Sequence, residues 1–153
     1  MSAPGPVEPM YQEQAMEFPY KHSTGETVGR FLAGLKEQKT IWGHRVKGQG
    51  VVVPPMGYSE LDAADDGGEW VAVQNTGVIT AAAIVHQPLE RLHPFAQPFA
   101  YVLVKLDGAD TALASVVRDD LGKVKVGARV QAEWKADDQR VGSVADLHFR
   151  VVG

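Results

Sequence analysis

The second half of the chain is a series of short, strand-like segments separated by turn residues. Turn chemistry stands at Asn75-Thr76-Gly77, Asp107-Gly108 and Asp137-Asp138. In the last two segments apolar and polar residues alternate, as in strands that bury one face. No helical segment long enough for a crossover between parallel strands interrupts the series. The predicted strands are Trp70–Gln74, Val78–His86, Phe99–Leu106, Thr111–Val117, Arg129–Trp134 and Val144–Val152.

Five or six short strands with this spacing predict a mainly β protein with a small antiparallel barrel, and the five-stranded OB-fold is the natural candidate. Upstream, Val28, Phe31, Leu32 and Leu35 follow the spacing of an amphipathic helix that ends near Gln38. We therefore expect three parts: a disordered or partly helical lead-in over 1–19, a helix with a ribbon-like module over 20–69, and an OB-fold over 70–153.

The segment between the helix and the strands is laid out like a zinc ribbon that lacks its metal ligands. An apolar strand, Val51-Val52-Val53, ends in Pro54-Pro55, and the four positions where a ribbon carries cysteine hold Val46, Gln49, Ser59 and Asp62. Structural zinc sites need four ligands, most often thiolates and imidazoles, and the chain has no cysteine. We therefore expect a metal-free module with no zinc and no other cofactor.

The composition excludes several classes of protein. Hydrophobic residues make up 44% and charged residues 22% of the 153 residues, as in ordinary soluble domains. No apolar run is long enough for a membrane span, and a net charge of −4 argues against nucleic-acid binding. The N-terminus has no pattern of a secretory signal, so a cytoplasmic location is expected. Without cysteine there is no thiolate nucleophile, and the five scattered histidines form no metal or acid/base motif, so no catalytic residue is predicted.

The order of helix, ribbon-like module and barrel resembles the thiolase-associated OB-fold proteins, domain-of-unknown-function family thirty-five. The resemblance covers most of the chain, from about Tyr20 to Val152, and depends on the order and spacing of several short motifs. These motifs are Arg30-Phe31, Val53-Pro54-Pro55, Gly77-Val78-Ile79-Thr80, Val85-His86-Gln87-Pro88, the hairpin from Pro98 to Gly108, and Val126-Gly127-Ala128-Arg129-Val130. The missing ribbon cysteines depart from the family pattern, so the family's metal role is not carried over.

The resemblance implies a non-catalytic accessory subunit of a thiolase, acyl-CoA aldolase or acyltransferase. The expected partners are a thiolase-like catalytic subunit, which supplies the chemistry, and the acyl-CoA thioester bound by the complex. The accessory chain would order or complete the acyl-CoA site. The alternative is a free-standing OB-fold module that binds single-stranded nucleic acid through a basic groove with aromatic platforms, against which the acidic net charge weighs.

Two sets of residues are candidates for contacts in such a complex. Basic side chains suit the phosphates of CoA, although surface lysines are more often only solvated. The connection from His86 to Pro98 is stiffened by prolines and carries large apolar residues, which either plug the barrel mouth or contact a partner. The CoA-binding candidates are Lys36, Lys39, Arg45, Lys47, Arg91 and His93. The partner-interface candidates are Phe31, Trp42, Tyr58, Leu89, Leu92 and Phe95.

Overall fold

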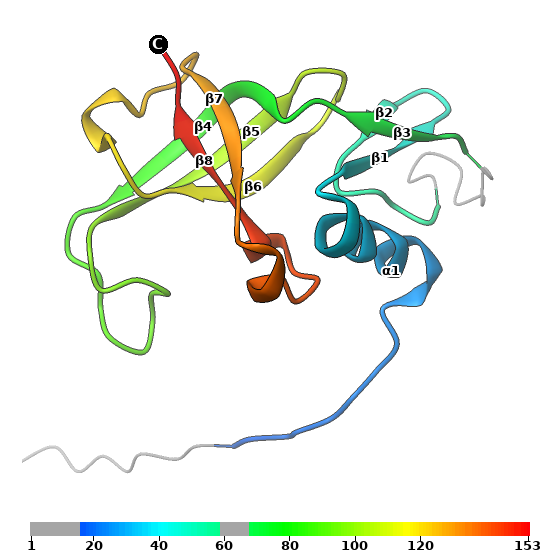
Figure 1. Ribbon diagram of the computed structural model, residues 1–153, viewed down its shortest axis with the longest axis horizontal. Coiled ribbons are helices and arrows are strands. Elements are labelled where there is room, and N and C mark those ends of the chain that lie inside the picture. Colours follow the sequence, from blue (N-terminus) through cyan, green and yellow to red (C-terminus); the bar gives the residue numbers. More distant parts are fainter. Residues whose placement is uncertain (1–15, 59–67) are drawn as a thin grey trace, which may run out of the picture.

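The computed structural model describes residues 16–58 and 68–153. Its larger part is a closed five-stranded barrel with the strand order β4-β5-β6-β8-β7 (Figure 1). Neighbouring strands are antiparallel except for β6 and β8, which are parallel. This architecture confirms the predicted OB-fold barrel. The strands are β4 Thr76–Val85, β5 Phe99–Leu106, β6 Ala112–Val117, β7 Arg129–Trp134 and β8 Leu147–Val151, with single 3-10 turns at η2 Leu121–Lys123, η3 Asp137–Gln139 and η4 Val144–Asp146.

The central strand β5 shows how the sequence pattern determines which residues face the interior of the barrel. Its residues alternate between the interior and the outside: Val102, Val104 and Leu106 are buried, whereas Tyr101 and Leu103 are exposed. Because side chains of a strand point to opposite faces in turn, this pattern places one row in the core and one on the outer face. The outer row is unusual since two of its three residues, Tyr101 and Leu103, are apolar, and only Lys105 is charged.

A smaller module precedes the barrel. It consists of the helix α1 Gly25–Ala33, a π-helical turn η1 Gly34–Gln38, and a three-stranded sheet in the order β2-β1-β3. Its strands are β1 Ile41–Val46, β2 Gly50–Val52 and β3 Trp70–Val73. Of the six predicted strands, five close the barrel, and the first, β3, pairs with β1 instead. The positions of Ser59 and Asp62 lie outside the described residues.

The start of α1 differs from the expected cap. Ser23 and Glu26 have the spacing of a capping box, but the N-cap residue is Thr24, and it makes no side-chain cap hydrogen bond. Ser23 Oγ accepts a hydrogen bond from the Gly25 N–H at 3.1 Å, one residue before the Glu26 N–H that a capping box would use. At the other end of the helix, Gly34 allows the Trp42 ring to lie against the backbone, because a Cβ at this position would overlap the ring.

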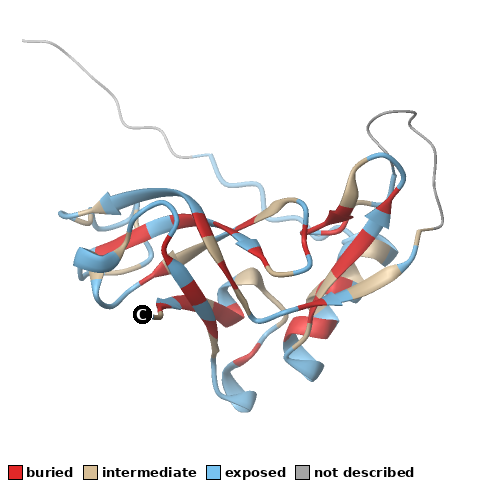
Figure 2. Cartoon of the chain, turned by 90° about the horizontal axis from the view of Figure 1, so that it is seen from above, coloured by how far each residue is buried: buried red, intermediate tan, exposed pale blue. Residues whose placement is uncertain are grey.

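The module and the barrel share one hydrophobic core. Phe31, Leu35 and Ile41 of the module belong to the same buried cluster as Ile79 and Val104 of the barrel. Figure 2 shows the buried positions along both parts. Since buried apolar surface is the main favourable term in folding, the module is stabilised by the barrel as well as by its own sheet.

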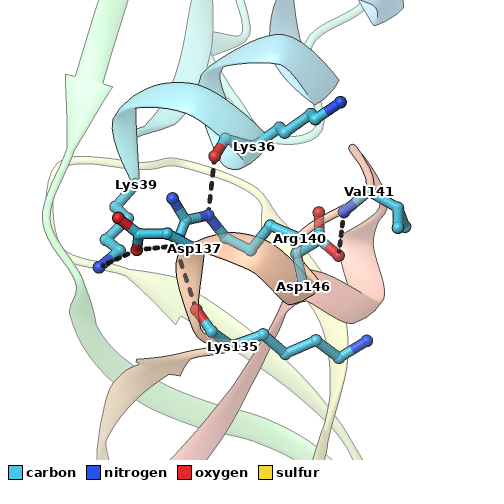
Figure 3. A network of polar contacts seen from close by, with 7 residues as sticks. All are labelled: Lys36, Lys39, Lys135, Asp137, Arg140, Val141 and Asp146. Atoms are coloured by element: carbon cyan, nitrogen blue, oxygen red, sulfur yellow. Dashed lines mark hydrogen bonds and ion pairs between the residues drawn. The ribbon is translucent and has the colours of Figure 1, made fainter.

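A buried arginine adds a polar link between the two parts (Figure 3). Arg140, in the β7–β8 connection, donates from Nε to the Lys36 carbonyl of η1 at 2.7 Å and from one terminal nitrogen to the Lys135 carbonyl at 3.1 Å. The same nitrogen contacts the Asp137 carboxylate at 2.6 Å, and Lys39 Nζ lies 2.8 Å from that carboxylate. The hydrogen bonds from Lys39 and then Arg140 lower the pKa of Asp137 to about 2.

The connection that carries Arg140 is itself held by a buried carboxylate. Asp146 accepts hydrogen bonds from the backbone N–H groups of Val141, Gly142 and Ser143, at 3.1, 2.7 and 3.0 Å. Burial by itself raises the pKa of this carboxyl, but the three backbone donors outweigh burial and hold its pKa below the ordinary value. The β7–β8 connection is thus held at two points, by the hydrogen bonds of Arg140 and by those of Asp146.

We predict that Arg140→Met lowers the free energy of unfolding by about 2–4 kcal/mol, because it removes charge-assisted hydrogen bonds at a buried position. Urea denaturation measures the change. The matched control is Arg150→Met, which removes an exposed arginine whose Nε lies 2.6 Å from Glu133, and such exposed pairs contribute only about 0–1 kcal/mol. An equal effect of the two substitutions would contradict the structural role assigned to Arg140.

Acid should weaken the fold through Asp107. Hydrogen bonds from Arg129 and Thr76 lower the pKa of this carboxyl from 3.8 to about 2. Its stabilising contribution is therefore complete above about pH 4 and is lost as the pH falls toward 2. We expect Asp107→Asn to flatten the decline of unfolding free energy between about pH 5 and 2. Arg129→Met should flatten the same part of the curve, and unchanged slopes in both variants would disprove the assignment.

Candidate functional site

A groove with a volume of about 970 Å³ is hollowed into the outer face of the barrel. Its floor is the exposed row of β5, Tyr101 and Leu103, with Ala81 and Ala83 of β4 on one side and Ala114 of β6 on the other. Tyr101 and Leu103 are 43% and 42% exposed. The small alanine side chains keep the floor open, while the tyrosine and leucine offer apolar contact area. This volume lies within the range of ligand-binding clefts.

Two connections form the walls of the groove. The β4–β5 connection contributes Pro94 and Phe95, and the β7–β8 connection contributes Lys135, Gln139 and Val144. These are the loops after the first and the fourth strand of the barrel. OB-folds bind their ligands on the face of strands two and three, between these two loops. The groove therefore lies at the ligand face of the fold.

The charged groups around the groove are all basic. Arg118, Lys135 and His148 line it, and no aspartate or glutamate does so among the described residues. The Arg118 guanidinium lies over the Phe95 ring, 4.8 Å from its centroid. His148 Nε2 lies 3.2 Å from the Glu133 carboxylate. On a chain with a net charge of −4, this local excess of positive charge favours an anionic or acidic ligand.

The β4–β5 connection divides into packed and exposed residues. Phe95 is half-buried, and its ring meets the Phe99 ring edge-to-face at 5.1 Å. His93 accepts a hydrogen bond at Nδ1 from the Leu89 N–H at 2.8 Å and so braces the loop. Leu89 and Leu92 are 59% and 69% exposed. Phe95 thus packs on the barrel, and the two leucines are the interface candidates that the loop leaves uncovered.

The six basic candidates do not form one cluster. Lys36 and Lys39 belong to the end of η1, while Arg45 and Lys47 lie at the far end of β1, about 15–20 Å further along a strand of this length. Lys39 pairs with Asp137, and Arg45 Nε lies 3.0 Å from Glu69. Arg91 and His93 lie in the β4–β5 connection, on the opposite side of the molecule from β1 (Figure 1).

The remaining interface candidates belong to the module. Phe31 is 2% exposed and is part of the core, so it presents no surface to a partner in this structure. Trp42 is half-buried against Gly34, and Tyr58 is exposed. Arg30 stacks its guanidinium 5.7 Å from the Trp42 ring centroid and 4.4 Å from that of Trp70. This stack covers the small sheet on the helix side.

A buried histidine holds the ribbon-like module together. Both ring nitrogens of His44 lie at hydrogen-bond distance from backbone carbonyls, Nδ1 3.1 Å from Met56 and Nε2 2.8 Å from Gly68. The ring also packs against Trp70 at 5.3 Å. Within residues 16–58 and 68–153, no group of three or more His, Asp or Glu side chains is arranged to hold a metal ion. In this module, the contacts of one buried histidine with the backbone of two segments stand where a ribbon has zinc.

The sequence alone predicted a residue in one wall of the groove, the β4–β5 connection. It predicted neither the floor nor the opposite wall, which the β7–β8 connection forms. Of the three apolar interface candidates in the proline-rich loop, Phe95 lines the groove, whereas Leu89 and Leu92 do not. The signal for the floor was available in β5, where the exposed residues that alternate with buried ones are Tyr101, Leu103 and Lys105, two of them apolar. No sequence pattern predicts the role of Arg140, because its partners are mostly backbone carbonyls. No helix in the described part of the chain is both long and apolar enough to cross a membrane.

The chain is similar to known proteins in both sequence and fold. Residues 70–135 match the family model described as "ChsH2, C-terminal OB-fold domain". A solved structure titled "Ltp2-ChsH2(DUF35) aldolase" superposes with a TM-score of 0.62 and 21% identity, over 85% of this chain and 98% of that chain. A DUF35-family protein of unknown function from Sulfolobus solfataricus gives a TM-score of 0.58 and 22% identity, over 84% and 87%. No curated protein matches.

The two solved structures share the fold of this chain across the module as well as the barrel, since each covers more than four-fifths of it. The sequence match runs from β3 to the end of β7 and so includes four of the five barrel strands, all but β8. Together they confirm the resemblance drawn from the short motifs. The part from 70 to 135 is similar in sequence to the OB-fold domain of ChsH2, the fold is shared with the two DUF35 structures, and the chain has no cysteine for a zinc ribbon.

Proposed function

We propose that this chain is a non-catalytic accessory subunit of a thiolase-like enzyme that acts on acyl-CoA thioesters. The observation that carries the proposal is the exposed apolar surface of the barrel, with Tyr101 and Leu103 in the groove and Leu89 and Leu92 exposed in the β4–β5 connection. Exposed apolar surface of this extent is typical of a protein that binds another molecule. The similar structure that is titled an Ltp2-ChsH2 aldolase bears a name that joins two proteins.

The chemistry of the chain supports a structural role. It has no cysteine, and a thiolase forms its covalent intermediate on a cysteine thiolate. In the described part, no three metal-ligating side chains converge. The groove offers apolar contacts and basic side chains, which bind and orient a partner but do not form or break bonds. The nucleophile, the base and the oxyanion hole would come from the partner chain.

The basic residues outside the groove remain candidates for CoA. Lys36 is exposed beside Lys39, whose charge is already paired with Asp137, so Lys36 is the better candidate of the two for a phosphate. Arg91, exposed in the β4–β5 connection with a positive φ of 71°, is held by the loop toward solvent. Each would offer charge-assisted hydrogen bonds to a phosphate of CoA.

A second candidate function is binding of single-stranded nucleic acid. It is favoured by the presence of Phe95, Tyr101 and Trp134 with Arg118 and Lys135 in one groove, because aromatic rings and basic groups are the elements of such sites. The net charge of −4 opposes it.

We predict that the chain alone has no turnover on acyl-CoA thioesters and that it enables or raises turnover by its thiolase-like partner. The measurement is a thioester assay of each purified protein and of their mixture. A partner that is fully active alone, and unchanged on mixing, would refute the accessory role. The same protein pair carrying Leu89→Asp and Leu92→Asp should associate at least about tenfold more weakly, since exposed apolar anchors carry much of the energy of an interface.

We also predict that the purified chain holds no stoichiometric zinc. The reason is the ligand set: with Val46 and Gln49 at two of the four ribbon positions, the module cannot offer the four ligands of a structural zinc site. Elemental analysis after dialysis against a chelator tests this, and circular dichroism should show the same fold before and after. About one zinc per chain that survives dialysis would overturn the prediction.

A further inference from the structure

We infer that the groove on the outer face of the barrel is a binding site for a small apolar carboxylate, which places its hydrocarbon part on Tyr101 and Leu103 and its charge on Arg118. The inference goes beyond the proposed function, because the ligand is a free acid that this chain holds by itself. The exposed Leu89 and Leu92 of the β4–β5 connection remain the candidate surface for the partner protein.

The first observation is an apolar strip on a single face of the sheet. Two cross-strand rows form the strip, and the registers of β4, β5 and β6 place both rows on the outer side. All six side chains are uncharged and line the groove. The rows are Ala81, Leu103 and Ala114, and Ala83, Tyr101 and Val116. A hydrocarbon that lies on one of these rows therefore contacts the other row as well.

The second observation is a positioned cation at one end of the strip. Arg118 follows Val116 by two residues and lines the same groove. Its guanidinium lies over the Phe95 ring, 4.8 Å from the centroid, and a contact of this kind holds the planar group in place. Among the ion pairs of the described residues, none includes Arg118. A guanidinium in this state suits the two oxygens of a carboxylate.

The third observation is the enclosure of the strip. The β4–β5 and β7–β8 connections wall it on two sides, and the groove has a volume of about 970 Å³. Sites for small molecules are hollows of roughly 300–1,000 Å³, lined mostly by apolar side chains with a few polar groups that fix the orientation of the ligand. The groove of this chain has that size and that composition, so its occupant is a small molecule with a large apolar part.

The charges of the groove select among such molecules. Arg118, Lys135 and His148 line it, and no carboxylate does so within residues 16–58 and 68–153. A cationic amphiphile would therefore meet only basic groups. A nucleic acid needs a basic path along its successive phosphates, and the two rows of the strip contain no cation. An apolar carboxylate satisfies both parts at once, because Tyr101 and Leu103 lie roughly 7 Å apart along β5 on the face that also carries Arg118.

The test titrates the full chain with decanoate, decyltrimethylammonium and acetate. The first two ligands share a long hydrocarbon chain and differ in the sign of their charge, whereas acetate keeps the carboxylate and lacks the chain. Isothermal titration, below the concentrations at which micelles form, should show about one decanoate per chain. Decanoate should bind at least about tenfold tighter than either of the others. In amide NMR spectra the shifts caused by decanoate should centre on Tyr101 and Leu103.

Two substitutions test the two parts of the site separately. Arg118→Gln should weaken decanoate binding by about tenfold or more without weakening decyltrimethylammonium, since it removes the partner of the carboxylate. Leu103→Glu should weaken decanoate to a similar extent, since it puts a like charge on the floor. The matched control is Lys125→Gln, which removes a positive charge at an exposed position outside the groove and should leave decanoate binding unchanged. Circular dichroism checks that each variant is folded.

Several results would overturn the inference. They are equal binding of decanoate and decyltrimethylammonium, equal binding of acetate, several decanoates per chain, NMR shifts centred outside the groove, full binding by Arg118→Gln, or an equal loss in Lys125→Gln. Tighter binding of oligothymidylate would overturn it in favour of a nucleic acid. The wild-type titrations decide the question even if a variant does not fold. Because the isolated chain is titrated, these outcomes are independent of the accessory role, which is tested by mixing with the partner.

Discussion

The attachment of the N-terminal module to the barrel is the constraint on which the rest of the structure depends. The shared core supplies the apolar part of this attachment, and Arg140 supplies the directional part by bonding the carbonyl of Lys36 across the boundary. A hydrogen bond to a backbone carbonyl fixes both distance and angle. The same side chain contacts Asp137 and the Lys135 carbonyl, so it also sets the course of the connection that forms one wall of the groove. The shape of the ligand face is therefore coupled to the position of the helix.

The groove combines two properties that are usually separate. Its floor is apolar and shallow, as in a surface that packs against another protein, and its walls hold aromatic and basic groups, as in a site for anions. Both follow from the barrel topology: β5 is the second strand and carries the floor, and the two loops that frame it come from either side of the sheet. Substitutions in the outer row of β5 and in the two loops can therefore change which ligand is bound without altering the core.

The sequence predicted the barrel well because its signals are local. Alternation in Arg129–Trp134 and Leu147–Val151, with glycine and aspartate turns between the strands, depends only on neighbouring residues. The partner of β3 could not be predicted in this way, because pairing with β1 across a long connection is a non-local choice. The basic candidates failed to come together for a related reason: closeness in sequence around β1 does not mean closeness in space when an extended strand separates Lys39 from Lys47. Arg140 and His44 were missed because backbone carbonyls, which every residue has, are their main partners.

The lack of cysteine in the ribbon-like module has a consequence for the conditions in which this protein remains intact. A free-standing zinc knuckle unfolds when its thiolates are oxidised or its metal is removed, since metal binding supplies its folding energy. Here Val51 and Val53 of that module lie in the common core with barrel residues, and His44 links its segments through main-chain carbonyls. No residue of the chain can form a disulfide or a sulfenic acid on cysteine. Thiol-reactive electrophiles therefore have no cysteine to attack in this chain, and peroxide is left with its four methionines, whose sulfoxides are reducible.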